Sequence, residues 1–238
     1  MALPIANVAK YELTLPSQQK NIAYRPFLVK EEKILLQALE SAKPEEMLTA
    51  VKEIVKACTF GTIEPDEYPI FDIEYIFLQI RSKSVGEIAK LKVLCPDDKK
   101  SYGNVDVDLT KVEVYVDDTH NNNIVLDESR KLGVVLKYPS LNMIDAGILK
   151  DDIKVAAMYE LIKKSVDHIY EGDKMYYAKD STPKELDDFI DSLTGEQMRK
   201  IQVFFSSMPR LEHKIKVTNP NTKVESEVTL KGLTDFFG

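Results

Sequence analysis

Apolar and polar residues alternate with a period of two near the beginning of the chain. Residues 10–15 and 21–27 both show this alternation, and a polar stretch that begins at Pro16 separates them. This pattern predicts a β-hairpin, because successive side chains of a strand point to opposite faces of a sheet. Pro26 has no backbone N–H to donate, so we expect the second strand at a sheet edge or close to its own end.

The period then changes to that of a helix. Residues 30–40 carry apolar positions at helical spacing, and this first helix stops before Pro44. A second helix is predicted to begin at Pro44 and to end near Gly61, since glutamates occupy its first turn. Residues 71–83 are apolar at most positions and form a run that is long for a strand, so they predict a mostly buried helix.

Residues 87–116 return to strand-like patterns and predict a second hairpin. An apolar run leads into a turn at Cys95 and Pro96, and strict alternation follows from Asn104 onward. The alternation indicates a sheet with one face in solvent. A further short strand is expected over residues 134–138.

The last third of the chain is predicted to be mostly helical. Acidic residues begin an amphipathic helix over 151–170, and lysines occupy its later half, as the helix dipole favours. Thr182 and Thr194 each precede a Glu or Gln by three positions, which is the capping-box pattern at the start of two more helices. Residues 213–230 alternate again and predict a C-terminal hairpin.

Together these elements predict an α+β protein with several helices and two or three β-hairpins. Segments 91–96 and 215–220 resemble each other, and each opens a hairpin after a predicted helix. Either a duplicated helix-plus-hairpin unit or convergent turn chemistry explains this echo. We expect one integrated unit over residues 1–238. Its subregions are an N-terminal hairpin (1–29), a helical region (30–86), a β-hairpin region (87–139), a second helical region (140–208), and a C-terminal hairpin with a tail (209–238).

Composition limits the class of protein. Hydrophobic residues make up 44% of the chain and charged residues 30%, with a formal net charge of −7, as expected for a globular protein with a core. No window predicts a membrane span or a secretory signal peptide. The acidic balance argues against nucleic acid as a partner, and the scattered glycines cannot form a phosphate-binding loop. The sequence therefore predicts no nucleotide cofactor.

The turn at Cys95 has the shape of half a zinc knuckle, in which two thiolates three positions apart hold a tetrahedral ion. Asp98 occupies the place of the second thiolate. Asn219 and Thr222 stand at the corresponding places of the C-terminal hairpin. Because these side chains are poor zinc ligands, we expect an ordinary turn and no tightly bound metal.

Catalytic constellations are weak throughout the sequence. Cys58 falls on the apolar stripe of its helix, which predicts a core residue rather than a nucleophile. Asp106 and Asp108 lie on one face of a strand, where metal-assisted chemistry could use them, but a solvated strand face has the same pattern. The histidines form no paired motif; they are His120, His168 and His213. We predict no enzyme and keep a metal-dependent hydrolase or transferase as the rival.

Aromatic residues near edges and termini are better candidates for function, because aromatic side chains are enriched at the centres of protein interfaces. Tyr24, Arg25 and Phe27 are predicted to lie at a contact with another protein or at the junction of the N-terminal hairpin and the first helix. The chain ends in a short apolar stripe that closes the fold or forms a docking site. This stripe includes Leu233, Phe236 and Phe237.

Several segments carry a family resemblance over nearly the whole chain. The sequences YRPFLVKEEKILL and FDIEYIFLQIRSKSVGE are the most specific, and GVVLKYPSL and the ending VTLKGLTDFFG add to them. With these residues the chain resembles the small baseplate hub subunits of T-even-type contractile-tailed bacteriophages, the phage baseplate protein family. Relatives often have a fuller Cys-Pro-x-Cys at the first hairpin, from which Asp97 and Asp98 depart.

The resemblance implies a non-enzymatic component or assembly factor of the baseplate hub that acts by protein–protein interaction. Its partners would be other hub proteins, and a homo-oligomer stays open. It would act in the host cytoplasm during assembly, and either remain in the virion tail baseplate or leave. A transient hub-folding chaperone that is absent from the virion is the alternative within this class.

Overall fold

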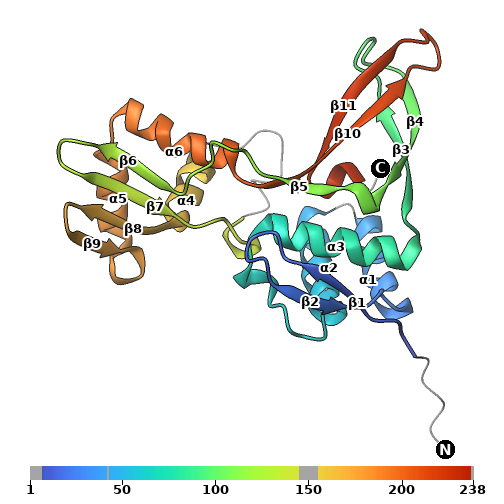
Figure 1. The fold of residues 1–238 in the computed structure, drawn as a ribbon, viewed down its shortest axis with the longest axis horizontal. Coiled ribbons are helices and arrows are strands. Elements are labelled where there is room, and N and C mark those ends of the chain that lie inside the picture. Colours follow the sequence, from blue (N-terminus) through green and yellow to red (C-terminus); the bar gives the residue numbers. More distant parts are fainter. Residues whose placement is uncertain (1–6, 42, 145–154, 237–238) are drawn as a thin grey trace, which may run out of the picture. The chain divides into compact units, whose positions relative to one another are not determined.

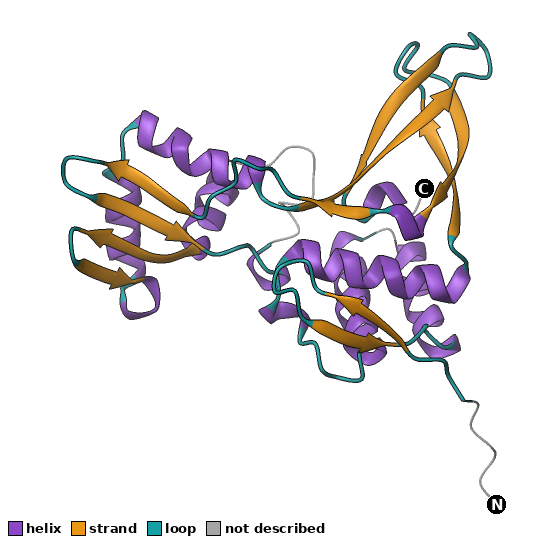
Figure 2. Cartoon of the chain, viewed as in Figure 1, coloured by secondary structure: helices purple, strands orange, loops and turns teal. Residues whose placement is uncertain are grey.

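The computed structural model describes residues 7–41, 43–144 and 155–236, and it confirms the predicted α+β class (Figures 1 and 2). Contacts between residues divide the chain into two compact units. Unit 1 comprises residues 1–115 and 210–238, and unit 2 comprises residues 116–209. That the chain acts as one integrated unit stays a prediction.

The N-terminal half of unit 1 contains the elements expected from its sequence. A hairpin is followed by three helices, of which the first packs on the second and the second on the third. Pro44 opens the second helix, where its missing N–H leaves no intrahelical bond unmade. The elements are β1 (Tyr11–Thr14), β2 (Asn21–Tyr24), α1 (Val29–Ser41), α2 (Pro44–Cys58) and α3 (Ile70–Val85).

Two longer hairpins complete unit 1, and both were expected. One forms a two-stranded sheet, and the first strand of the other also pairs with a short strand that precedes unit 2 in the chain. Unit 2 is therefore inserted between two strands of one sheet. The elements are β3 (Ile88–Leu94), β4 (Tyr102–Asp108), β5 (Glu113–Tyr115), β10 (Arg210–Thr218) and β11 (Glu225–Lys231).

The continuous alternation predicted after Asn104 does not form one strand. The structure interrupts it with a 3-10 turn over Leu109–Lys111, and Asp108 caps this turn by accepting from the Thr110 N–H. Beyond the turn, β5 pairs with β10 rather than with β3. A buried cluster lies between α3 and these strands, with Phe236 and Leu109 fully buried in it.

Unit 2 has a four-stranded antiparallel sheet in the order β6-β7-β8-β9. Helices cover one face of it, as Figure 2 shows, and their apolar residues share a buried cluster with the sheet. Both predicted capping boxes are present, at Thr182 and Thr194. The elements are β6 (Asn123–Asp127), β7 (Leu132–Leu136), α4 (Val155–Ser165), β8 (Val166–Glu171), β9 (Lys174–Tyr177), α5 (Pro183–Asp191) and α6 (Gly195–Ser207).

The long helix predicted over 151–170 is wrong over its last five residues, 166–170, and its first four residues lie outside the described residues. Helix α4 ends at Ser165, and β8 begins at the next residue. Strand β8 pairs on both sides, with β7 and with β9, so its hydrogen bonds come from residues distant in sequence. The predicted helical region 140–208 therefore contains a hairpin.

Candidate functional site

Tyr24 and Arg25 lie at the junction of the N-terminal hairpin and α1, and both side chains are buried. The Arg25 guanidinium donates from Nη2 to Glu31 Oε1 at 2.9 Å, and Glu31 Oε2 also accepts from the Leu28 N–H at 2.8 Å. Burial would raise the pKa of Glu31, but these hydrogen bonds outweigh burial and lower it. Phe27 is half-buried, and its N–H donates to Ser84 Oγ at 2.9 Å.

The predicted C-terminal stripe packs against unit 1. Phe236 is fully buried, and Leu233 is half-buried against the same cluster. The Leu233 N–H donates to Glu74 Oε1 of α3 at 3.2 Å, and burial raises the pKa of Glu74 to about 7. Phe237 lies outside the described residues. The terminal segment therefore packs on the buried cluster of unit 1 through Leu233 and Phe236.

The two turns that resemble half zinc knuckles lie against each other. Asp97 accepts from Asn219 Nδ2 at 3.0 Å and from Thr222 Oγ1 at 2.5 Å. The hydrogen bonds from Asn219 and Thr222 lower the pKa of Asp97. Asp98 accepts instead from the Ser101 N–H, within its own turn. We name this arrangement the tip clamp, defined by Asp97, Asn219 and Thr222.

In the tip clamp, the side chains that stand where a metal site would need ligands are hydrogen-bonded to one another instead. Burial raises the pKa of the Cys95 thiol, and hydrogen bonds from Ser101 hold the pKa of Asp98 far below its usual range. Among the described residues, no group of three or more His, Cys, Asp or Glu side chains is placed to hold a metal ion. The absence of tightly bound zinc stays a prediction.

The rival catalytic pair has local roles. Asp108 Oδ1 accepts from the Thr110 N–H at 3.1 Å and from Thr110 Oγ1 at 2.6 Å. Asp106 stands opposite Lys90 across the β3–β4 hairpin. Both positions thus fit a solvated strand edge with a capped turn. Cys58 is buried, as expected, and burial raises the pKa of its thiol to about 11.

The histidines also lie in different surroundings. His120 is half-buried, with Nδ1 at 2.9 Å from Ser207 Oγ and Nε2 at 3.0 Å from Tyr138 Oη. His168 was expected at the end of a helix but lies in β8, with Nδ1 at 2.8 Å from Asp167. Burial lowers the pKa of His120, which favours the neutral ring. The Ser207 side chain is buried, and its hydroxyl donates to the Val203 carbonyl within α6 at 2.7 Å, so it fits a structural role.

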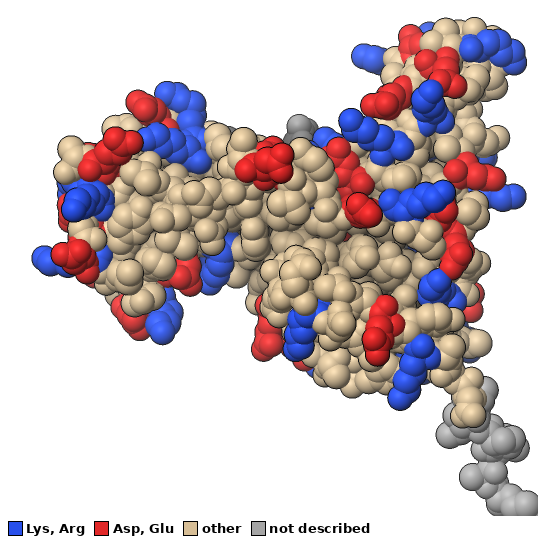
Figure 3. Space-filling model, viewed as in Figure 1, with Lys and Arg blue, Asp and Glu red and all other residues tan. Residues whose placement is uncertain are grey.

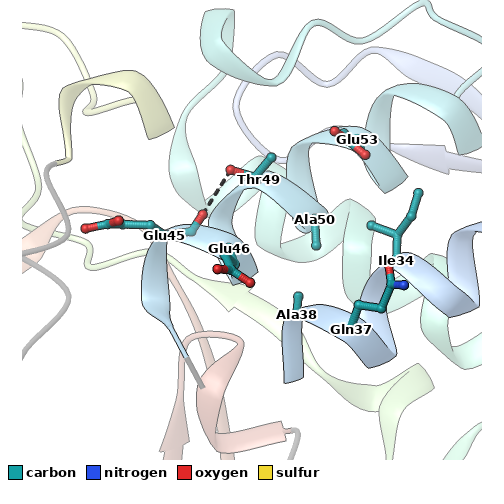
Figure 4. Close-up of a pocket in the computed structure, with 8 residues that line it drawn as sticks. All are labelled: Ile34, Gln37, Ala38, Glu45, Glu46, Thr49, Ala50 and Glu53. Carbon is teal, nitrogen blue, oxygen red and sulfur yellow. Dashed lines mark hydrogen bonds between the residues drawn. The ribbon is translucent and has the colours of Figure 1, made fainter. Parts of the chain in front are cut away.

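A hollow of about 350 Å³ lies between α1 and α2 (Figure 4). Three glutamates line it, and Glu46 accepts from Lys43 Nζ at 2.7 Å. Thr49 Oγ1 donates to the Glu45 carbonyl at 2.9 Å, within the same helix. The Thr49 hydroxyl is thus engaged within its own helix, and the lining residues include no histidine, cysteine or serine. The lining consists of Ile34, Gln37, Ala38, Glu45, Glu46, Thr49, Ala50 and Glu53.

Another candidate surface was not predicted from the sequence. On the side of the unit 2 sheet away from its helices, cross-strand register aligns Val125, Gly133, Tyr170 and Met175 in one row. Figure 3 shows this face as largely uncharged, with charged side chains around its rim. We name it the open face. It consists of Val125, Gly133, Val135, His168, Tyr170, Met175 and Tyr177.

Aromatic contacts order the open face. The Tyr170 ring lies over Gly133, where a Cβ would stand 2.2 Å from Tyr170 Oη, and Tyr170 Oη donates to Asn123 Oδ1 at 2.9 Å. His168 and Tyr177 rings lie 5.4 Å apart. Val125 is 44% exposed and Met175 60%, so apolar side chains remain in solvent. The sequence signal for this face was the Gly172–Asp173 pair, a favoured hairpin turn within the predicted helical region.

Comparison with known proteins gives one family. The model of the family described as T4 bacteriophage base plate protein matches residues 8–238. No curated protein and no solved structure matches the chain. No helix among the described residues is both long and apolar enough to cross a membrane.

Proposed function

Because the chain belongs to the T4 bacteriophage base plate protein family, we propose that it is a non-enzymatic component or assembly factor of the baseplate hub. It acts by binding other hub proteins of a contractile-tailed bacteriophage. The proposal takes the host cytoplasm as the place of assembly and the tail baseplate as the destination of a resident subunit.

The open face is the observation that carries this proposal. An uncharged, aromatic-rich surface with a charged rim is typical of protein interfaces, because the central residues lose contact with water on binding. The opposite face of the same sheet is covered by the helices of unit 2. The rim of the open face carries both signs of charge, as Figure 3 shows. Such a rim favours a protein over the uniformly negative backbone of a nucleic acid.

Phe27 is a second candidate contact, because its side chain is only half-buried while Tyr24 and Arg25 are buried. It adjoins Leu28 and Val29, which are 39% and 65% exposed. Replacing Phe27 with Ala tests this site separately from the open face. Loss of a hub complex in co-purification with unchanged circular dichroism would support the contact.

A charge on the open face tests the central claim. Val125→Lys should abolish co-purification with hub proteins from infected cells while the melting temperature stays unchanged, since Val125 lies in solvent. Val203→Lys is the matched control, because Val203 is also apolar and 56% exposed but lies on α6. If both variants retain the hub proteins, the open face is not the binding surface.

Mass spectrometry of purified virions beside an infected-cell lysate separates the two roles. A resident subunit is present in both samples. An assembly factor, including the hub-folding chaperone, is abundant in the lysate and absent from virions. Absence from every hub complex in the lysate would contradict the proposal as a whole.

A further inference from the structure

The two edges of the unit 2 sheet are protected to different degrees. At the β6 edge, Gln197 Nε2 donates to the Leu126 carbonyl at 3.3 Å, and Lys200 Nζ donates to the Val125 carbonyl at 3.2 Å. Helix α6 therefore covers this edge with long polar side chains. All residues of β9 are exposed, by contrast, and its extensive contact is with β8. An exposed edge strand is a template for pairing with another chain.

The hairpin register determines which groups β9 presents. Glu171 pairs with Lys174 across the turn at Gly172, and Ile169 pairs with Tyr176. In an antiparallel ladder, alternate residues bond to the same neighbour, so Lys174 and Tyr176 direct their backbone groups to β8. Met175 and Tyr177 direct theirs outward. Ser181 Oγ donates to the Tyr177 carbonyl at 3.0 Å, and that oxygen keeps a second lone pair.

We propose that β9 pairs antiparallel with β9 of a second copy of this chain, about a twofold axis at Tyr176. In this register, Met175 of each copy exchanges backbone hydrogen bonds with Tyr177 of the other. The thioether then lies beside a tyrosine ring, a favourable contact. Tyr177 Oη already donates to Met175 Sδ at 3.7 Å within one copy. The open faces of the two copies become one continuous surface.

Charge complementarity selects both the occupant and the register. The outward backbone groups of Met175 and Tyr177 could also pair in an alternative register whose twofold axis passes through Met175. In that register Lys174 would stand opposite Tyr176 of the other copy. The register centred on Tyr176 instead brings Asp173 of each copy toward Lys179 of the other, so opposite charges meet at both ends. Each end of β9 carries both signs of charge, with Asp173 and Lys174 at one end and Lys179 and Asp180 after the other, so an antiparallel copy of the strand can match them.

The pair should be weak, because β9 spans only Lys174–Tyr177. Stable interfaces bury roughly 1,200–2,000 Å² in total, and a strand pair this short contributes a small part of that area. We therefore expect a concentration-dependent dimer of the purified chain. The inference does not rest on the proposed function, since the purified chain alone tests it.

Sedimentation velocity over a concentration series tests the dimer. Met175→Lys places a lysine near Lys179 of the other copy and should raise the dissociation constant at least about tenfold. Val203→Lys is the matched control, because Val203 and Met175 are 56% and 60% exposed and both lie in unit 2. A monomeric wild-type chain at all concentrations, or equal weakening by both variants, would overturn the proposal.

Disulfide trapping tests the register. Residues that face each other in a non-hydrogen-bonded pair lie about 4.5 Å apart at Cα, within disulfide range. Under mild oxidation, Tyr176→Cys should form a covalent dimer rapidly and Met175→Cys slowly. The native thiols do not compete, since Cys58 and Cys95 are buried. Rapid trapping through Met175→Cys alone, or through neither variant, would contradict the Tyr176 register.

Discussion

The sheets of both units have alternating apolar and polar residues, but the two units differ in how much of the apolar surface they bury. In unit 1, the β3–β4 and β10–β11 hairpins bury their apolar sides around Phe236, and the tip clamp joins their turns. In unit 2, the helices cover one face of the sheet, and the open face stays in solvent. These two hairpins therefore bury one apolar side within unit 1, whereas the sheet of unit 2 keeps a face that a partner can bury.

This difference indicates where substitutions should affect stability and where they should affect binding. A substitution in the unit 1 cluster removes packing that nothing else supplies. A substitution of an exposed residue of the open face, such as Val125 or Met175, changes a group that is already largely in water. The following predictions test whether the contrast holds.

The largest effect is expected from Phe236→Ala. Phe236 is fully buried in the unit 1 cluster, and removal of a buried phenylalanine ring typically costs about 3–5 kcal/mol. Hydrogen exchange should accelerate throughout β3, β4, β10 and β11 and stay unchanged in β6 to β9. Tyr177→Ala on the open face is the control and should cost far less, about 1 kcal/mol or below, because mainly its cross-strand contact with the His168 ring is lost. Equal loss of protection in both units would instead mean that they unfold as one.

Arg25→Ala should have the next largest effect. It leaves the Glu31 carboxylate buried without its cation, which typically costs about 3 kcal/mol or more. Chemical denaturation would measure the change, and Lys30→Ala, at the exposed ion pair to the same carboxylate, is the control. An unchanged free energy of unfolding combined with loss of a hub complex would instead support the predicted contact at Arg25.

Local patterns predicted unit 1 better than unit 2. The hairpin turns of unit 1 open with an X-Pro pair, and the structure gives them a common form. The N–H four residues later donates back to the carbonyl of Leu15, Cys95 or Asn219. The donor residue has positive φ in each case. Because the N-terminal hairpin shares this form, the echo between the other two is consistent with convergent turn chemistry.

Unit 2 shows what local pattern cannot supply. Residues 166–170 continue a helical pattern in sequence, but pairing with both β7 and β9 makes them a strand. That pairing joins residues far apart along the chain, and the sheet register also decides which side chains share the open face. The burial of Arg25 was missed for a similar reason, since its ion pair with Glu31 depends on how the hairpin meets α1.

A pH-dependent effect of intermediate size is expected from Glu74→Gln. Burial raises the pKa of folded Glu74 to about 7 from an ordinary value of 4.5. The folded state thus binds the proton more tightly than the unfolded state, so stability falls as pH rises between these values. Gln removes this charge while its carbonyl can still accept from Leu233. We expect a gain on the order of 2 kcal/mol at pH 8 and little at pH 4.

Thermal unfolding at both pH values measures this difference, and Glu113→Gln, at an exposed position of β5, is the control. The gain at high pH should appear in unit 1, because Glu74 accepts a hydrogen bond from Leu233, in the segment that also contains Phe236. A gain of the same size at both pH values would contradict titration of Glu74 as the cause.

The smallest effect is expected at the tip clamp, from Thr222→Val. This change keeps the side-chain shape and removes the hydroxyl that donates to Asp97. The pKa of Asp97 should rise toward its ordinary value of 3.8, because one of the hydrogen bonds that lower it is lost. A carboxyl group whose pKa is lowered in the folded state stabilises the fold at every pH above its ordinary pKa. The variant should therefore lose this stabilisation at neutral pH.

Carboxyl chemical shifts during an NMR titration measure the pKa of Asp97, and hydrogen exchange measures opening of the two turns. Thr229→Val, on β11 away from the turn, is the matched control. We expect faster exchange at the turn amides with almost no change in melting temperature, because the unit 1 cluster stays intact. If Thr222→Val lowers the melting temperature as strongly as Phe236→Ala, the tip clamp rather than the buried cluster holds the two hairpins together.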